Sequence, residues 1–311
     1  MFSFIQKQWF LIGIATASLL GYFHPEWGVS IGNYDVIGIG VFLAFFSTGL
    51  CLETRGILRQ INSFRAPVAA ILSSLVLYPI LAWLLALPLL PYEFVVGICI
   101  IGVGPVTVSS GTILTAIARG NVPLSILICI STSCLAIFTI PVVLNVLLSV
   151  GTDIELPILG MLMGLVLKIL VPIAFGQLLR PLIKNVVTRY DHQLSIFQSC
   201  IIILIIFNVV SNSADNLTQA GSVVIGVTIF VICLHFLMLL INYMIAGLIK
   251  IDRASTIAFT IHTSQKTLTV SYIVWASYFA AEYPMAFIPA IVCQLTQMCL
   301  GTFLAEYFKK T

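Results

Sequence analysis

Long apolar segments follow one another along almost the whole chain, and only short polar stretches separate them. The lengths of these segments suit helices that cross a hydrocarbon core about 30 Å thick, some of them tilted. The pattern predicts an all-α membrane protein in which ten transmembrane helices form one membrane domain over residues 1–311. The predicted spans cover residues 8–23, 36–51, 67–89, 93–118, 122–148, 157–180, 194–212, 221–249, 253–280 and 284–305.

The composition agrees with a membrane protein. The chain is 60% hydrophobic and 8% charged, whereas a soluble domain carries about 25% charged residues. The net charge of +3 does not indicate nucleic acid as a partner. The eight cysteines all fall in apolar segments without metal-ligand spacing, so we expect reduced thiols, no metal site and no cofactor. The first apolar run lacks a small-residue cleavage site, which favours a first span over a signal peptide.

The charges predict the orientation of the spans. Counted from a cytoplasmic N-terminus, twelve of the fourteen basic residues fall in inner loops and tails: Lys7, Arg55, Arg59, Arg65, Arg119, Arg180, Lys184, Arg189, Lys250, Arg253, Lys309 and Lys310. The charged residues of the outer loops are all acidic, namely Glu26, Asp35, Glu93, Asp153, Glu155, Asp215 and Glu282. The positive-inside rule therefore places both termini in the cytoplasm. The short tails favour a bacterial inner membrane over a eukaryotic one.

Ten spans divide into two halves of five, residues 1–150 and 151–311. Because the number of spans in each half is odd, the second half is inserted upside down, as in many secondary transporters. The fourth span of each half is interrupted near its middle, by Gly102–Pro105 in the first and by the polar run 260–269 in the second. A second half-helix that begins at 107–112 would direct free N–H groups and hydroxyls at the crossing point, which favours an anion.

Lys168 and Lys266 are the two basic residues left inside predicted spans, and no carboxylate falls there. Lys266 is 13 residues from Arg253 and 16 from Glu282, so it lies close to the bilayer midplane. An ammonium at that depth costs about 2.5–3.5 kcal/mol even on the lenient insertion scale, which makes a functional role the default hypothesis. The apolar neighbours of Lys168 leave open that it reaches water along a tilted helix.

Two motifs carry a resemblance to a known family. The run from Gly104 to Asn121, which ends in Ala-Arg-Gly-Asn, and the Lys-Thr-Leu-Thr element at 266–269 resemble the bile acid:sodium symporter family. The similarity extends from span 2 to the C-terminus and is greatest to the branch of the seventh vertebrate member and its bacterial relatives. The resemblance implies two inverted five-helix repeats. Spans 1, 2, 6 and 7 would form a panel, and spans 3–5 and 8–10 a core in which broken helices 4 and 9 cross. It also implies alternating access, with a small organic anion as cargo.

The sequence departs from this family at the positions that bind sodium. The family's Ser-Asn pair falls on Gly111 and Thr112, and its span 3 glutamine on Ser74. Its span 9 glutamate falls on Ile261 or His262, whereas Ser125 and Gln265 are retained. Because sodium prefers several hard oxygen ligands, including a carboxylate, this depleted set predicts weak or no sodium dependence.

Three interpretations of Lys266 remain open. Its ammonium replaces sodium and donates to Ser109, Thr112, Thr263 or nearby carbonyls, which is the interpretation we favour. Alternatively it faces the crevice and pairs with the anion, assisted by Lys168, or it exchanges a proton during transport, a role that His262 would share. The candidates for the ion site or the substituting cation are Lys266, Gln265, Thr263, Ser264, Thr112, Ser109, Ser110 and Ser125. The candidates for substrate binding are Pro105, Thr107, His262, Thr267, Gln294, Gln297 and Lys168.

Other function classes compete with this one. A non-transporting regulator or a sodium-coupled symporter on the same scaffold is the main alternative. An intramembrane hydrolase with Ser109 or Ser264 as nucleophile and His262 as base lacks an orienting acid and an oxyanion motif. We therefore predict that the protein is not an enzyme.

Overall fold

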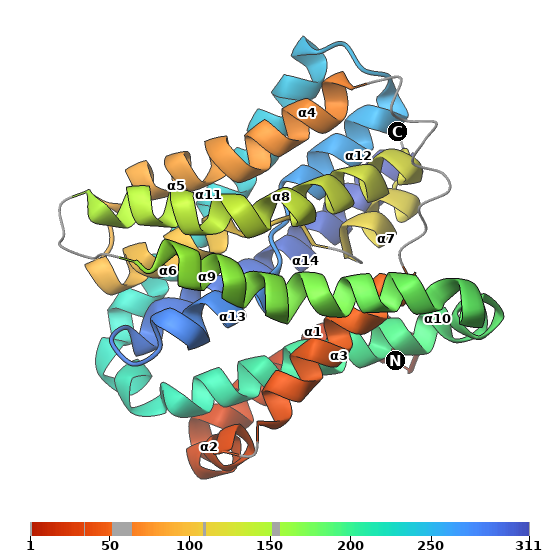
Figure 1. Cartoon of the computed structure of the whole chain (residues 1–311). Helices are drawn as coiled ribbons and strands as arrows, with labels where there is room; N and C mark the ends of the chain where they lie inside the picture. Colours follow the sequence, from red (N-terminus) through yellow and green to blue (C-terminus); the bar gives the residue numbers. More distant parts are fainter. Residues whose placement is uncertain (1, 34, 52–63, 108–109, 151–155, 311) are drawn as a thin grey trace.

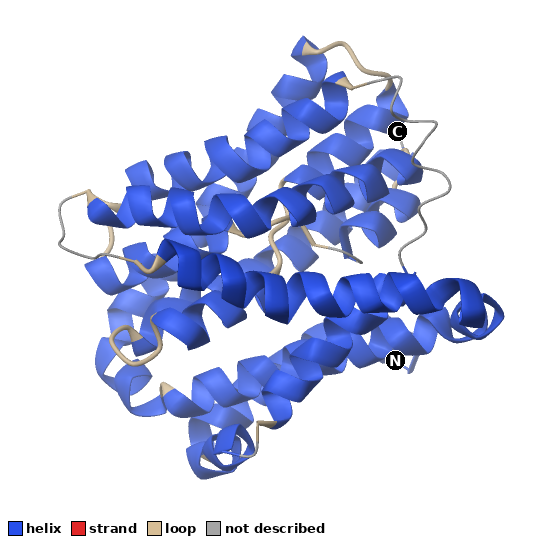
Figure 2. Cartoon of the chain, in the orientation of Figure 1, coloured by secondary structure: helices blue, strands red, loops and turns tan. Residues whose placement is uncertain are grey.

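The computed structural model describes residues 2–33, 35–51, 64–107, 110–150 and 156–310. Within these residues the protein is all-helical, and Figure 2 shows helices joined by short loops without a strand. The elements in chain order are α1 (Phe2–Phe23), α2 (Pro25–Asn33), α3 (Val36–Cys51), α4 (Arg65–Leu72), η2 (Ser73–Leu77), α5 (Tyr78–Ala86), α6 (Tyr92–Val103), α7 (Ser110–Ile117), α8 (Val122–Ser149), α9 (Ile158–Leu165), η3 (Val166–Leu170), α10 (Val171–Asn212), α11 (Ala214–Leu248), α12 (Arg253–Thr263), α13 (Leu268–Tyr278), η4 (Pro284–Phe287) and α14 (Ile288–Lys310).

Five described helices are long and apolar enough to cross a membrane. They are Arg65–Ala86, Val122–Ser149, Ile158–Asn212, Ala220–Leu248 and Pro284–Lys310. A sixth span is added if Pro25–Gly32 and Val36–Cys51, which bend by 68°, count as one. Trp9–Phe23 and Tyr92–Val103 are shorter apolar helices. The described helices overlap the predicted apolar segments, but five or six of them qualify as spans where ten are predicted. Two bends inside α10, at Ile183 and Tyr190, fall between the predicted spans 157–180 and 194–212.

One helix was not predicted. The sequence treats the stretch between the first two apolar segments as an outer loop, but the structure forms α2 there. Two glycines allow α2 to lie directly against α10, because a Cβ at Gly28 would lie 2.0 Å from Ser211 Oγ and one at Gly32 would lie 2.7 Å from Asn208 Nδ2. The amide of Asn208 donates to Gly28 O at 2.8 Å. Packing against α10 therefore stabilises a helix whose own composition does not predict it.

The helices gather in two groups with a long helix between them (Figure 1). Helices α1, α2 and α3 pack on α10, and helices α4 to α8 pack with α11 to α14. The segment from α9 into α10 contacts both groups. Helix α10 is bent at Ile183 and Tyr190, and Figure 1 shows it turning back at the right, so that its second half lies with α1 and α3. Both termini lie at the same end of the molecule, on the right of Figure 1, together with the ends of α7 and α12 that are nearest Arg119 and Arg253.

Small residues hold α3 and α10 close together. A Cβ at Gly49 would lie 2.2 Å from Ile173 O, and one at Gly176 would lie 2.3 Å from Phe46 O. Such backbone-to-backbone approach is typical of helix pairs in membranes, where packing rather than a hydrophobic driving force holds helices together. The glycines thus fix the position of α10 beside the central cavity described below.

Candidate functional site at two interrupted helices

Two helices are interrupted in the middle of the molecule, at the places that the sequence indicates. Helix α6 ends at Val103 and α7 begins at Ser110, while α12 ends at Thr263 and α13 begins at Leu268. The two interruptions contact each other, because the backbone N–H of Thr267 donates to Pro105 O at 3.0 Å. The freed peptide groups of both helices therefore meet at one point, and each of these groups needs a partner in the protein.

Lys266 lies at this point and is completely buried. Its Nζ donates to Ser74 O at 2.6 Å, to Ser74 Oγ at 3.1 Å and to Gly104 O at 2.8 Å. The same nitrogen lies 4.5 Å from the centre of the Tyr78 ring, within the range of a cation–π interaction. These oxygens provide acceptors for the three protons of an ammonium. The sequence analysis expects Ser109, Thr112, Thr263 or nearby carbonyls as acceptors; in the structure the acceptors are the carbonyls of Ser74 and Gly104 and the hydroxyl of Ser74.

The carbonyl of Ser74 is available because the helix around it widens. In the π-helical segment Ser73–Leu77, the N–H of Tyr78 donates to Ser73 O rather than to Ser74 O. The next residue, Pro79, has no N–H to donate. Ser74 O therefore has no donor from its own helix and accepts from Lys266. Pro79, five residues after Ser74, is the sequence signal for this acceptor.

Gln297 holds the backbone of Lys266 from both sides. The N–H of Lys266 donates to Gln297 Oε1 at 2.8 Å, and Gln297 Nε2 donates to Lys266 O at 2.9 Å. Gln297 Nε2 also lies 2.8 Å from Gln294 Oε1. Gln297 is fully buried, and these two hydrogen bonds fix the backbone of the interrupted helix at Lys266.

His262 joins the second interruption to the first and to α8. Its Nε2 lies 2.6 Å from Thr107 O, and since a carbonyl only accepts, this nitrogen is a donor. Its Nδ1 hydrogen-bonds to Ser125 Oγ. A Cβ at Gly111 would lie 2.3 Å from the imidazole Cδ2, which explains why a residue without a side chain stands there. His262 is fully buried and is absent from the lining of the described cavities.

The remaining polar groups of the run 260–269 also face inward. Gln265 Oε1 accepts from Thr107 Oγ1 at 2.9 Å and from Ser110 Oγ at 3.0 Å. Gln265 Nε2 and Thr263 Oγ1 are buried without a hydrogen-bond partner among the described residues. Gln265 therefore ties the start of α7 to the second interruption.

Ser264 belongs to a buried hydrogen-bonded chain that the sequence analysis did not anticipate. Ser73 Oγ donates to Asn242 Oδ1 at 2.5 Å, and Asn242 Nδ2 donates to Ser264 Oγ at 2.8 Å. Ser264 Oγ in turn donates to Thr260 O at 2.8 Å. A single asparagine in the apolar run of α11 is a signal for such a partner, because a buried amide must be hydrogen-bonded.

The structure brings most of the candidate residues together but separates some of them. Thr112 lies beside Ser125, with 3.3 Å between the two hydroxyl oxygens. Lys168 lies elsewhere: it is exposed, and its Nζ donates to Ser277 Oγ at 2.8 Å, near the end of α13. Ser109 lies outside the described residues.

A cavity of about 640 Å³ reaches the crossing point from the end of the molecule that carries the termini. It lies between α1, α3 and α10 on one side and α7, α13 and α14 on the other. Hydroxyls and an amide line its inner part: Thr48, Thr107, Ser110, Thr267, Thr269 and Gln294. Its charged and titratable lining residues are His192, Glu306 and Lys309. A solute in this cavity would therefore meet neutral polar groups at the crossing and charged groups toward the opening.

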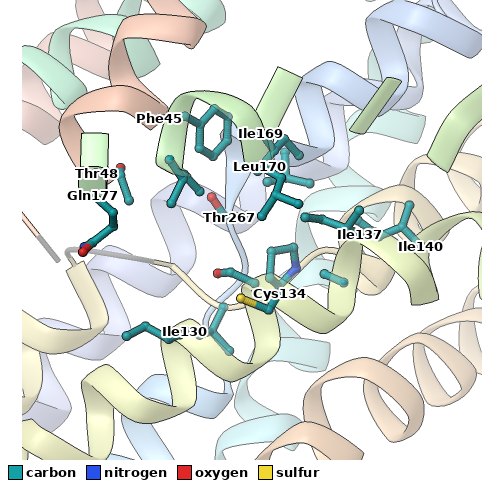
Figure 3. A pocket seen from close by; sticks show the side chains of 16 residues that line it. Phe45, Thr48, Ile130, Cys134, Ile137, Ile140, Ile169, Leu170, Gln177 and Thr267 are labelled. Carbon is teal, nitrogen blue, oxygen red and sulfur yellow. The ribbon is translucent and has the colours of Figure 1, made fainter. Parts of the chain in front are cut away.

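A second cavity of about 200 Å³ lies beside the first and shares Phe45, Thr48 and Thr267 with it. Pro105 and the α8 residues Ile137 and Ile140 also line it. Figure 3 shows the hydroxyl of Thr267 surrounded by mostly apolar side chains. Thr267 thus lines both cavities, and its backbone joins the two interruptions.

Comparisons with known proteins cover nearly the whole chain. A model of the SBF-like CPA transporter family matches residues 8–310. Sodium/bile acid cotransporter 7-A of Xenopus laevis is 27% identical over 98% of this chain and 92% of its own length. The uncharacterized sodium-dependent transporter YocS of Bacillus subtilis is 25% identical over 97% of this chain and 91% of its own length. The probable chloroplastic sodium/metabolite cotransporter BASS4 of Arabidopsis thaliana is 24% identical over 98% of this chain and 73% of its own length. The resemblance inferred from the two motifs is confirmed.

Proposed function

The chain belongs to the SBF-like CPA transporter family, and on that premise we propose that it moves a small organic anion by alternating access with weak or no dependence on sodium. Membership makes the protein a multi-pass membrane transporter and not an enzyme. The identity of the solute and the independence from sodium are the proposal.

The proposed architecture has ten spans in two inverted repeats, residues 1–150 and 151–311. The interrupted pairs α6–α7 and α12–α13 would be the fourth span of each repeat. The group around α3 and α10 would be the panel, and the remaining helices the core. The position of both termini at one end of the molecule (Figure 1) supports an even number of crossings; ten crossings, cytoplasmic termini and a bacterial inner membrane are part of the proposal.

The observation that carries the proposal is the cavity that ends at the crossing point. At 640 Å³ it is of the size that small-molecule sites have. It meets the first turns of two half-helices, through Ser110 of α7 and through Leu268 and Thr269 of α13. The N–H groups and dipoles at such helix starts favour a negatively charged group. Thr107, Thr267 and Gln294 add neutral hydrogen-bonding groups around it.

The proposed independence from sodium rests on the side chains that donate hydrogen bonds to the carbonyls freed by the helix interruptions. Gly104 O accepts from Lys266 Nζ at 2.8 Å, and Thr107 O lies 2.6 Å from His262 Nε2. Two nitrogen donors of the protein thus occupy acceptors that a bound cation would otherwise coordinate. Lys266 also takes both oxygens of Ser74. The names of the relatives include sodium, and the proposal departs from them at this site.

The proposal is tested by ion replacement. Purified protein is reconstituted in liposomes, and uptake of each member of a panel of organic anions is measured in sodium and in choline buffer. We expect at least one anion to be taken up at rates that agree within about twofold in the two buffers. Uptake that requires sodium and is lost in the Thr112→Ala variant would support a sodium-coupled symporter instead. Thermal stabilisation by an anion without any uptake would support a non-transporting regulator.

A further inference from the structure

We propose that the groove between α11 and α14 binds an anionic phospholipid from the leaflet on the side of the termini, which the proposed orientation makes the cytoplasmic leaflet. The groove has a volume of about 340 Å³. It is lined by Phe236, Leu239, Leu240, Tyr243, Thr260, Leu300, Phe303, Leu304, Tyr307 and Phe308.

The groove is separate from the central cavity. On α14 the cavity is lined by Gln294, Met298, Thr302, Glu306 and Lys309, and the groove by Leu300, Phe303, Leu304, Tyr307 and Phe308. At 100° per residue these two sets lie on opposite faces of the helix. The groove side is open to the surroundings, since Phe303 is 75% and Phe236 63% exposed. In a membrane this face meets lipid.

One polar group in the groove lacks a partner. Thr260 is 2% exposed, and its Oγ1 has no hydrogen-bond partner among the described residues. A buried hydroxyl without a partner is unfavourable. An acyl chain alone would not satisfy it, whereas an ester carbonyl of a phospholipid would accept its proton. The hydroxyl therefore favours a ligand that is apolar along most of its length and has an acceptor toward one end.

The groove leads to basic residues at the end of the molecule with the termini. On α11 the stripe of Phe236, Leu240 and Tyr243 continues at helical spacing to Gly247, and Lys250 follows two residues after the helix ends at Leu248. A Cβ at Gly247 would meet nothing within 4 Å, so the surface next to Tyr243 is free at this position. On α14 the stripe of Phe303 and Tyr307 continues in the same way to Lys310.

Arg253 links the start of α12, which follows Lys250, to the end of α14, which carries Lys310. Its Nη2 donates to Phe308 O at 3.2 Å. The neighbouring acid, Asp252, accepts from Ser255 Oγ at 2.5 Å and caps α12. The charges that continue the two stripes are therefore positive, and each basic residue near an anionic leaflet contributes about fivefold in affinity.

These features fit a phospholipid better than a second copy of the chain. A phospholipid combines an acyl chain, an ester carbonyl and a phosphate, and the groove offers a matching group to each: the aromatic stripe, the hydroxyl of Thr260 and the basic residues at its end. A second copy docked by a twofold axis would bring equivalent lysines toward each other, which is unfavourable. The proposal therefore commits to an anionic lipid as occupant.

The test measures lipid retention. Delipidated protein is mixed with phosphatidylglycerol or phosphatidylcholine, and bound lipid is counted by native mass spectrometry. We expect preferential retention of phosphatidylglycerol. The double variant Lys250→Gln, Lys310→Gln should weaken retention roughly 10- to 30-fold, and Leu240→Trp, which fills the groove, should weaken retention of both lipids. Lys184→Gln, on α10 at the same end of the molecule, is the matched control and should leave retention unchanged.

Three results would overturn the proposal. They are equal retention of the two lipids by the unmodified chain, full retention of phosphatidylglycerol by both the double variant and Leu240→Trp, and cross-linking of cysteines at 240 in two copies of the chain. Thermal unfolding in detergent separates loss of the site from loss of the fold, because the variants should melt within a few degrees of the unmodified protein when no lipid is added.

Discussion

At the scale of single residues, the buried Lys266 is stable because each of its protons has an acceptor. Two of these acceptors are backbone carbonyls, Ser74 O and Gly104 O, which have lost the helical donors that would otherwise occupy them. The lysine thus satisfies the defects of two helices at once. The buried amine needs the free carbonyls of the interrupted helices as acceptors, and these carbonyls need the amine as a donor.

Replacing Lys266 with Met keeps the length and removes the donors. We expect the variant to be destabilised, because Ser74 O and Gly104 O would be left buried without partners, each at a cost of about 1–3 kcal/mol. The measurement is thermal unfolding of the purified protein in detergent. The matched control is Lys168→Met, whose ammonium is exposed and donates to one hydroxyl, and which should change stability far less. If both variants melt at the same temperature as the unmodified protein, Lys266 does not stabilise the point where the two interrupted helices meet.

Asp252 predicts a pH effect outside the membrane. The hydrogen bond from Ser255 Oγ lowers the pKa of the Asp252 carboxyl below its ordinary value of 3.8. A carboxyl whose folded-state pKa is lowered stabilises the fold above the ordinary pKa, and this contribution is lost as the pH falls through the folded-state value.

The comparison that isolates this effect is Asp252→Asn, which keeps an oxygen to cap α12 but cannot titrate. Melting temperatures of both proteins are measured from pH 6 down to pH 3. The unmodified chain should be more stable at pH 6, and its advantage should shrink below about pH 4. A difference that stays constant over the whole range would contradict the assignment.

At the scale of helices, close packing of α3 and α10 depends on two glycines. A Cβ at Gly176 would lie 2.3 Å from Phe46 O, so Gly176→Ala must push the helices apart, at a cost of about 1–3 kcal/mol. Gly226→Ala is the control: its Cβ would meet nothing within 4 Å, and the variant should gain about 0.5–1 kcal/mol from the helix preference of alanine. Unfolding in mixed micelles measures both. Stabilisation by both alanines would show that the helices adapt.

The sequence predicted the helices and their interruptions well, because apolar length and Gly-Pro or polar runs leave direct marks on it. It did not predict α2, because Glu26, Ser30 and the two glycines at 28 and 32 are typical of a loop. The helix is stabilised by packing against α10, which the local sequence does not indicate. It also did not predict the π-helical turn at Ser73–Leu77, because an apolar run looks the same for either helix type.

The sequence identified several residues of the site but not the residues that they contact. The polar run 260–269 identified Lys266, His262 and Gln265, which do meet at the crossing. Their partners come from elsewhere in the chain: Ser74 lies 192 positions from Lys266. Pairings over such separations depend on how helices pack, which periodicity does not specify.

At the scale of the whole molecule, the cavity and a set of contacts lie on opposite sides of the crossing. The 640 Å³ cavity extends toward the termini. Toward the other end, Lys168 Nζ donates to Ser277 Oγ at 2.8 Å and Tyr278 OH donates to Gly160 O at 3.2 Å. Both bonds join the α9–η3 helix to the end of α13, on the left of Figure 1. The cavity and these two hydrogen bonds thus lie toward opposite ends of the molecule, an arrangement that fits the alternating access proposed above.

If these two hydrogen bonds hold the outer side closed, weakening them should favour the opposite state. Each contributes about 0.5–1.5 kcal/mol, so Lys168→Met with Tyr278→Phe should shift the equilibrium roughly 5- to 150-fold toward a form in which the cavity is closed to the termini side. Ser199 lines that cavity. A cysteine at 199, in a chain whose eight native cysteines are replaced, should then react more slowly with a membrane-impermeant maleimide added from the termini side.

A tyrosine elsewhere on the surface provides the control for this measurement. Tyr243→Phe on α11 removes a hydroxyl that contributes to neither contact, so labelling at 199 should keep its original rate. Slower labelling in the double variant alone would tie the closure of one end to the opening of the other. If labelling at 199 keeps its rate in the double variant as well, the contacts at the outer end do not control the cavity. The two helix groups would then move, if at all, about a different part of the interface.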